Sequence, residues 1–228
     1  GAAGEERAGR LKGRGADPRI GIGSERRDRD VTIGGAAAGT GGDGLGGELP
    51  PRRRPWFHDN GAFRDFTAGH PFNMARWLRD QWRIRDRKLE PDFVVVPDIV
   101  GGGKASLMFS SEWRPVVAHG VPAYLVVQEG MSTENVGRVL DFAIDTDHPF
   151  AGLFVGGSAI EWKLESTPTW LGIARDRGLK LHVGRVGVPE RVAWARALAV
   201  DSIDSSFPLF TADRLAEFLA SCGILETT

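Results

Sequence analysis

The chain has 228 residues, of which 41% are hydrophobic, and a formal net charge of −1. It is therefore long and apolar enough for one sizeable core, and its charge argues against tight non-specific binding to nucleic acid unless basic side chains cluster locally. The single cysteine, Cys222, excludes an internal disulfide and a zinc site built from several thiolates.

Residues 1–55 differ in composition from the rest. They contain 15 of the 31 glycines, no aromatic residue and no apolar periodicity. We therefore divide the chain into a disordered Gly/Arg-rich tail, 1–55, and a folded domain, 56–228. There is no run of about 18 apolar residues and no signal-peptide core, so we expect a cytoplasmic protein without membrane contact.

From residue 56 onward, short apolar runs typical of buried strands alternate with amphipathic stretches typical of helices. The predicted strands are 55–58, 93–97, 123–127, 152–155, 179–183 and 200–203. The predicted helices are 73–88, 104–119, 133–144, 169–177 after the start signal Thr167-Pro168, 190–199 and 211–220. Continuous apolar strands that alternate with helices predict an α/β fold with a parallel sheet covered by helices. About six βα units indicate a TIM-type (β/α) barrel that is either incomplete or has its remaining strands in the tail.

Each predicted strand ends in polar or glycine-rich residues, and reactive groups gather at the carboxyl ends of parallel strands. The spacing of these ends is regular, with 30, 28 and 29 residues separating Asp98, Gln128, Gly156 and Arg185 in turn. The full set of strand-end candidates comprises three carboxylates, an amide, a bare backbone turn and a guanidinium: Asp59, Asp98, Gln128, Gly156, Gly157, Arg185 and Asp204.

Such a set suits a purine. Guanine presents N1–H and N2–H₂ donors beside an O6 acceptor, so its recognition needs a carboxylate next to an amide or a backbone N–H. Asp98 and Gln128 supply the first two, and Gly156–Gly157 lets a ligand approach main-chain N–H groups. The remaining carboxylates, Asp59 and Asp204, are candidates for cleaving an N-glycosidic bond, which needs a nucleophile and an acid.

Five segments, in this order, resemble motifs of the tRNA-guanine transglycosylases, and more closely those of their small phage relatives that modify DNA. They are HDNGAF at 58–63, VPD at 96–98, VQEG at 127–130, FVGGS at 154–158 followed by Trp162-Lys163, and HVGRV at 182–186 followed by DSIDSS at 201–206. The resemblance covers residues 56–210 and implies a (β/α) barrel with its active site at the strand ends.

The resemblance also implies a role for each candidate. Asp204 matches the family's second aspartate, the nucleophile, and is chosen over Asp201 for that reason, while Asp59 matches the essential aspartate near the reacting base. The implied base-binding residues are Asp98 for the N1 and N2 edge, Gln128 for O6, and Gly156 and Gly157 for their backbone N–H groups.

Together these roles imply a pentosyltransferase that exchanges guanine in nucleic acid, DNA rather than tRNA, for a 7-deazaguanine such as 7-cyano-7-deazaguanine. The exchange would pass through an aspartyl-glycosyl intermediate and use no cofactor. The sequence contains no Cys/His zinc subdomain of the kind with which the tRNA enzymes grip tRNA, so no metal is expected. Two alternatives remain open: an N-glycoside hydrolase on the same scaffold, and a non-catalytic barrel that binds nucleosides or nucleic acid.

Other features have a functional and an ordinary interpretation. Lys163 and Arg185 are candidates for phosphate or sugar contacts, or else partners in surface ion pairs. The helix at 75–90 has six basic against three acidic residues, which suits either a phosphate-facing patch or a solvated face. Gly101–Lys104 lacks the full spacing of a phosphate loop and is interpreted as a turn. Four histidines share no ligand spacing and are interpreted as ordinary side chains: His58, His119, His148 and His182.

Overall fold

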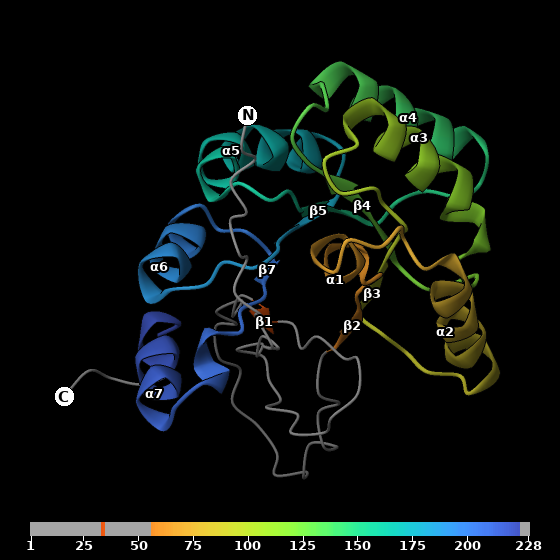
Figure 1. Ribbon diagram of the computed structural model, residues 1–228. Helices are drawn as coiled ribbons and strands as arrows, with labels where there is room; N and C mark the ends of the chain where they lie inside the picture. The colour runs from red at the N-terminus through yellow and green to blue at the C-terminus, as the bar shows by residue number, and fades with distance from the viewer. Residues whose placement is uncertain (1–32, 35–55, 224–228) are drawn as a thin grey trace, which may run out of the picture.

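The structure is a computed structural model and describes residues 33–34 and 56–223. Within these residues, seven strands form one sheet in the order β1-β7-β6-β5-β4-β3-β2. Strands β2 to β7 are parallel and curl into an open half-barrel, and helices α2 to α7 follow one another around its outside (Figure 1). The predicted α/β fold with about six βα units is confirmed, and the described part of the barrel is not closed.

The parallel strands are short and lie where the apolar runs predict them. They are β2 (Phe57–His58), β3 (Phe93–Val95), β4 (Ala123–Val127), β5 (Gly152–Val155), β6 (Lys180–Val183) and β7 (Ser202–Ile203). The α-helices of the described residues are α1 (Ala62–Thr67), α2 (Met74–Asp86), α3 (Gly103–Trp113), α4 (Thr133–Asp145), α5 (Ile160–Asp176), α6 (Pro189–Ala197) and α7 (Ala212–Ser221). Two 3₁₀ turns, η1 (Arg114–Val116) and η2 (Phe207–Leu209), complete these elements.

The central strands are buried on both faces, which explains why their sequences are apolar without interruption. Successive side chains of a strand point to opposite faces of the sheet. In β3, Phe93 and Val95 belong to an inner cluster with Phe57, Tyr124 and Val126, whereas the intervening Val94 belongs to the main core. The parallel sheet therefore has two apolar layers, one on each side.

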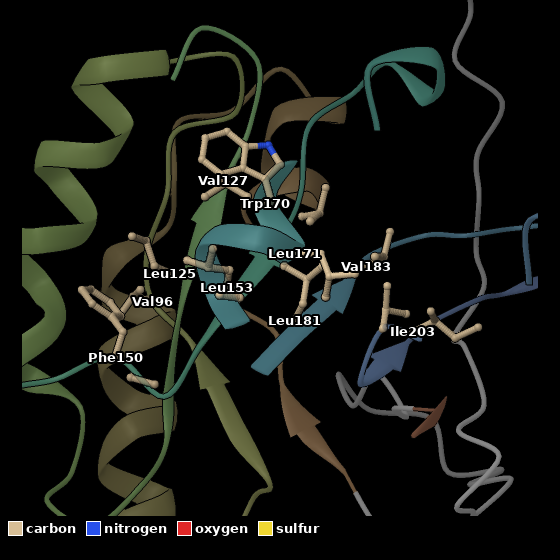
Figure 2. Packing of buried hydrophobic residues seen from close by; sticks show 14 of the residues in the cluster. Val96, Leu125, Val127, Phe150, Leu153, Trp170, Leu171, Leu181, Val183 and Ile203 are labelled. Atoms are coloured by element: carbon tan, nitrogen blue, oxygen red, sulfur yellow. The ribbon is translucent and has the colours of Figure 1, made fainter. Parts of the chain in front are cut away.

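The main core lies between the sheet and the outer helices. Figure 2 shows Leu125, Leu153 and Leu181 from three neighbouring strands packed with Trp170 and Leu171 of α5. All of these side chains are at most 5% exposed. This packing holds the outer helices against the strands.

The inner cluster is aromatic. The ring of Phe93 stacks on those of Phe57, at 4.7 Å between centroids, and Tyr124, at 3.9 Å. Close contact between neighbouring strands is possible because Gly152 lies beside Tyr124, where a Cβ atom would approach the ring to 2.5 Å. Offset aromatic stacking of this kind stabilises adjacent strands beyond simple burial.

Two details of the helices differ from the predictions. Helix α1 has only six residues and was not predicted, because so short a helix shows no apolar periodicity. Helix α5 begins at Ile160, nine residues before its predicted start, and Pro168 lies inside it rather than at its beginning. The Thr167 hydroxyl donates a hydrogen bond to the Lys163 carbonyl at 2.6 Å, one turn back, in the region where proline interrupts the helical bonding.

Strand β1 (Ile33–Gly34) pairs antiparallel with β7 and belongs to the segment 1–55 that was predicted to be disordered. The other residues of that predicted tail lie outside the described residues. Among the residues that the structure describes, no helix has the length and apolar character needed to cross a membrane.

The two-sided burial of the strands predicts a large difference between two leucines. Leu153 on β5 is fully buried, and Leu209 in η2 is 40% exposed. We expect Leu153→Ala to lower the free energy of unfolding by about 2–5 kcal/mol because it leaves a cavity beneath α5. The matched change Leu209→Ala should cost less than about 1 kcal/mol. Urea denaturation measures both, and equal losses would contradict the assignment of Leu153 to the core.

Candidate active site

The carboxyl ends of the six parallel strands bring the predicted site residues to one edge of the sheet. Contacts join them into two groups at that edge: Gln128 contacts Asp98, and Arg185 donates from its side chain to the Gly157 carbonyl and from its backbone N–H to Asp204. The charge of Asp59 acts on both Asp98 and Arg185, which links the two halves of the cluster. The structure thus gathers the strand-end candidates into one polar cluster.

Asp98 is held by an amide from the neighbouring strand end. Asn60 donates from Nδ2 to Asp98 Oδ1 and to the Val96 carbonyl, both at 2.7 Å. Its own side-chain oxygen accepts the Ala62 N–H at 2.8 Å, at the start of α1. Asn60 is 4% exposed, so it acts as a buried clamp between β2, β3 and α1. Among the described residues, Oδ2 of Asp98 has a single, long contact of 3.5 Å, from Gln128 Nε2.

This environment makes Asp98 reluctant to ionise. Burial raises its pKa to about 7, against the hydrogen bond from Asn60, which lowers it, and with a further increase from the negative charge of Asp59. At neutral pH, Asp98 therefore exchanges between a carboxylic acid and a carboxylate. A ligand that donates hydrogen bonds to it would favour the carboxylate form.

Gln128 is fully buried and its amide orientation is determined by the loop after β3. Its Nε2 donates to the Ile99 carbonyl at 2.8 Å and the Ser106 hydroxyl at 2.7 Å. Its Oε1 accepts the Gly101 N–H at 2.7 Å, which ties the glycine turn to β4. Gly101 has φ 73°, a left-handed conformation that suits glycine, and the interpretation of residues 101–104 as a turn is consistent with this geometry.

Asp204 has the opposite environment to Asp98. Its Oδ1 accepts the Arg185 backbone N–H and lies next to His182 Nε2, each at 3.0 Å. Burial acts to raise its pKa, but the hydrogen bond from His182, the Arg185 N–H and the charge of Lys163 outweigh burial and leave the pKa lowered. Asp204 is therefore ionised at neutral pH.

Two cations lie beside Asp204, at different depths. Lys163 is 1% exposed and donates from Nζ to the Gly184 carbonyl at 2.6 Å. Burial lowers its pKa to about 7, with a further decrease from Arg185 and opposing effects from Asp204 and Glu129. Lys163 thus lies beneath the cluster. Arg185 is only part-buried; its guanidinium lies 3.5 Å from the centre of the Phe63 ring, a close cation–π contact with α1.

The glycine turn after β5 is narrow. The Gly156 N–H donates to the Val127 carbonyl at 2.9 Å, whereas the Gly157 N–H has no partner among the described residues. Gly157 has φ +77°, and a Cβ atom there would lie 2.4 Å from the Glu129 carboxylate. Gly157 therefore supplies the backbone N–H of this turn that remains available to a ligand.

Glu129 connects the ends of β4 and β5. Its Oε1 accepts the backbone N–H groups of Ser158 and Ala159, at 2.9 and 2.8 Å, just before α5. A carboxylate at this position satisfies donors that the helix leaves unpaired and interacts favourably with its dipole. This long-range cap explains why α5 begins well before Pro168.

Four residues of the cluster were not selected from the sequence. Asn60 and Glu129 stand next to predicted residues, and adjacency to Asp59 and Gln128 was the available signal. Phe63 belongs to α1, which has no periodic pattern to identify it. His182, interpreted as ordinary, pairs with Ser202 in the register of β6 and β7, so it faces the same side as Asp204 two residues later.

Two further observations concern metal binding and the groove nearest to helix α3 in the part of the chain that the structure describes. The described residues contain no group of three or more His, Cys, Asp or Glu side chains that could hold a metal ion. A groove of about 820 Å³ lies along α3 and the end of α4, and none of the strand-end candidates lines it. The polar cluster and this apolar groove are therefore separate features.

No family model matches the chain, and no curated protein matches it. One solved structure, the PaMucR phosphodiesterase in complex with c-di-GMP, is similar at a TM-score of 0.38 and 14% identity, over 65% of this chain and 58% of that chain. The chain thus spans somewhat more than half the length of that protein.

The capping contact of Glu129 predicts how two substitutions differ. Glu129→Ala removes the oxygen that accepts the Ser158 and Ala159 N–H groups just before α5, and should lower the free energy of unfolding by about 1 kcal/mol. Amide hydrogen exchange at Ser158 and Ala159 should accelerate at the same time. Glu129→Gln keeps a side-chain oxygen and should retain most of the protection. Identical exchange in all three proteins would show that Glu129 does not cap α5.

Proposed function

We propose that this chain is a transglycosylase that exchanges guanine in DNA for a 7-deazaguanine, on a TIM-type half-barrel. The observation that carries the proposal is the pair of carboxylates with opposite tendencies: Asp204, with its pKa lowered, and Asp98, with its pKa raised to about 7. Exchange of a base needs an ionised nucleophile beside a group that recognises the base. The order of the five segments that resemble the transglycosylases supports the same roles.

In the first step, a carboxylate oxygen of Asp204 attacks C1′ of the nucleoside as the bond from C1′ to guanine N9 breaks. The electron pair of that bond goes to guanine, which is protonated with the help of Asp59, and an aspartyl ester of the sugar forms. In the second step, N9 of the incoming base attacks C1′, loses its proton and displaces the Asp204 carboxylate. Two inversions give net retention.

The base would lie between the two halves of the cluster. Asp98 Oδ2 would accept from N1–H and N2–H₂, with the Gly157 N–H and the Gln128 amide beside O6. Because both Nε2 hydrogens of Gln128 already have acceptors at 2.7 and 2.8 Å, its contact with O6 would replace one of these bonds. Arg185, stacked on Phe63, is the cation best placed to meet a phosphate or the sugar.

A duplex must present the nucleotide outside its stack for C1′ and the Watson–Crick edge to reach these groups together. The incoming base would be a 7-deazaguanine such as 7-cyano-7-deazaguanine, because its pyrimidine edge matches that of guanine and differs only at position 7. The same Asp98 and Gly157 groups can therefore hold the leaving and the incoming base in turn.

Replacement of Asp204 tests the nucleophile. Asp204→Asn keeps the shape of the side chain but removes the attacking charge, so incorporation of radiolabelled guanine into DNA should fall by about a thousandfold or more. Guanine affinity should change little, because Asp98 and Gly157 remain. Asp201→Asn is the matched control, since Asp201 accepts the Leu181 N–H at the other end of the strand, and it should exchange normally. Full exchange by Asp204→Asn would remove the assignment. If the unsubstituted chain binds guanine without exchanging it, the result would instead favour a non-catalytic barrel. If it releases free base with water as the acceptor, the result would favour a hydrolase.

The raised pKa of Asp98 predicts that guanine binding depends on pH. Below pH 7 the side chain is protonated and must lose its proton to accept from N1–H and N2–H₂, so affinity should fall as the pH decreases, by about tenfold for each pH unit below 7. Asp98→Asn should bind guanine weakly at every pH from 6 to 8. Calorimetric titration measures both, and Asp204→Asn should retain the pH dependence. A flat profile in the unsubstituted chain would rule out Asp98 as the base-holding carboxylate.

A further inference from the structure

His182 is a polar ring in an aromatic environment. It lies on β6, is fully buried and stacks on Phe154 with 4.6 Å between ring centroids. The rings of Phe57 and Phe93 lie 5.1 and 5.3 Å away. A buried imidazole needs hydrogen-bond partners for both nitrogens, because neither can reach water.

Both partners come from β7. His182 Nδ1 lies 2.9 Å from Ser202 Oγ, and His182 Nε2 lies 3.0 Å from Asp204 Oδ1. The parallel register places His182 directly opposite Ser202, and Asp204 faces the same side because it follows two residues later. The backbone pairing therefore imposes the arrangement in which one ring joins two residues of the neighbouring strand.

The two oxygens of Asp204 are not equivalent. Oδ1 has two neighbours, His182 Nε2 and the Arg185 N–H, whereas Oδ2 has no hydrogen-bond partner among the described residues. An ionised carboxylate only accepts hydrogen bonds, so Nε2 must carry the proton of the His182 contact. Nδ1 is then able to accept from the Ser202 hydroxyl, which favours that tautomer.

We propose that His182 is a positioning residue for Asp204. The His182 ring donates from Nε2 to Asp204 Oδ1, and Ser202 holds the ring in that tautomer. Asp204 Oδ2 is then the atom that attacks C1′. This inference rests on the proposed transglycosylase function. In the aspartyl ester, Oδ1 is the carbonyl oxygen and still accepts from Nε2–H. When the incoming base displaces Asp204, negative charge returns to the carboxylate, and the same donor stabilises the departing group.

Two amide substitutions separate this role from simple packing. Gln can place its NH₂ group near the position of His182 Nε2, and Asn can place its NH₂ group near that of Nδ1. His182→Gln thus keeps a donor for Asp204 and loses the contact with Ser202, and His182→Asn does the reverse. Both variants put a neutral amide into the same aromatic environment, so their effects on stability should be similar.

We expect kcat for base exchange to fall by about a hundredfold in His182→Asn, the scale of one lost donor, and by less than about tenfold in His182→Gln. The KM for guanine should change by less than about threefold in both, because Asp98 and Gly157 hold the base. Equal losses of kcat in the two variants would overturn the proposal, since they would indicate a role in packing alone. Should either variant fail to fold, Ser202→Ala keeps the His182 ring and should still lower kcat, because the favoured tautomer is lost. An unchanged kcat in Ser202→Ala would contradict the positioning role of His182.

A second readout does not depend on exchange activity. Asp204 can be titrated by carbon NMR of ¹³C-labelled aspartate in the full chain, assigned with Asp204→Asn. Lys163 and Arg185 also act on this carboxylate and are unchanged in both variants. The midpoint should rise by about one pH unit in His182→Asn and stay close to that of the unsubstituted chain in His182→Gln. Equal midpoints in all three would overturn the positioning role. A rise confined to His182→Asn in a chain without exchange activity would support the coupling and refute the proposed function alone.

Discussion

The parallel register of the central strands is the constraint on which the rest of the molecule depends. Each pair from β3 to β6 adds a strand in the same direction, so the carboxyl ends meet at one edge. Because both faces of these strands are buried, most of their side chains are apolar and the polar residues gather where the strands end; His182, within β6, is buried with hydrogen-bond partners on β7. The position of the site is therefore a consequence of how the sheet buries its apolar residues.

The site itself depends on the different pKa shifts of its two buried carboxylates, Asp98 and Asp204. Asp98 and Asp204 are both at most 9% exposed, yet of the two only Asp204 has two close donors on one oxygen and the basic side chain of Lys163 nearby. Asp98 instead receives a neutral amide and the repulsion of Asp59. Burial alone would raise both pKa values, so the difference comes from the partners. Two identical side chains thus differ in protonation within one cluster.

The strands and the set of strand-end residues could be predicted because their signals are local. A continuous apolar run such as 123–127 predicts a buried strand, and the residue that follows lies at the carboxyl end whatever the remaining fold. The start of α5 could not be predicted in this way, because Glu129, some 30 residues earlier, caps it. The start signal at Thr167-Pro168 proved wrong, because α5 begins at Ile160 and contains Pro168.

His182 was missed for a similar reason. In the sequence it is a lone histidine in an apolar run, and such a residue has no identifiable partner until strand pairing is known. The pairing of β6 with β7 supplies both partners at once. Because alternate residues of a strand face the same side, Ser202 and Asp204 can both be matched to His182. That match requires knowing that the two strands are neighbours and what their register is.

The two carboxylates also share a geometric principle. In each, one oxygen is anchored by the protein: Oδ1 of Asp98 by Asn60, and Oδ1 of Asp204 by Arg185 N–H and His182. The other oxygen has at most a contact of 3.5 Å among the described residues. An anchored carboxylate cannot rotate freely, so its second oxygen keeps a defined direction without being consumed by the protein's own hydrogen bonds. In each carboxylate, the hydrogen bonds to Oδ1 thus fix the orientation of the side chain, and the other oxygen stays available to accept from a ligand or to attack it.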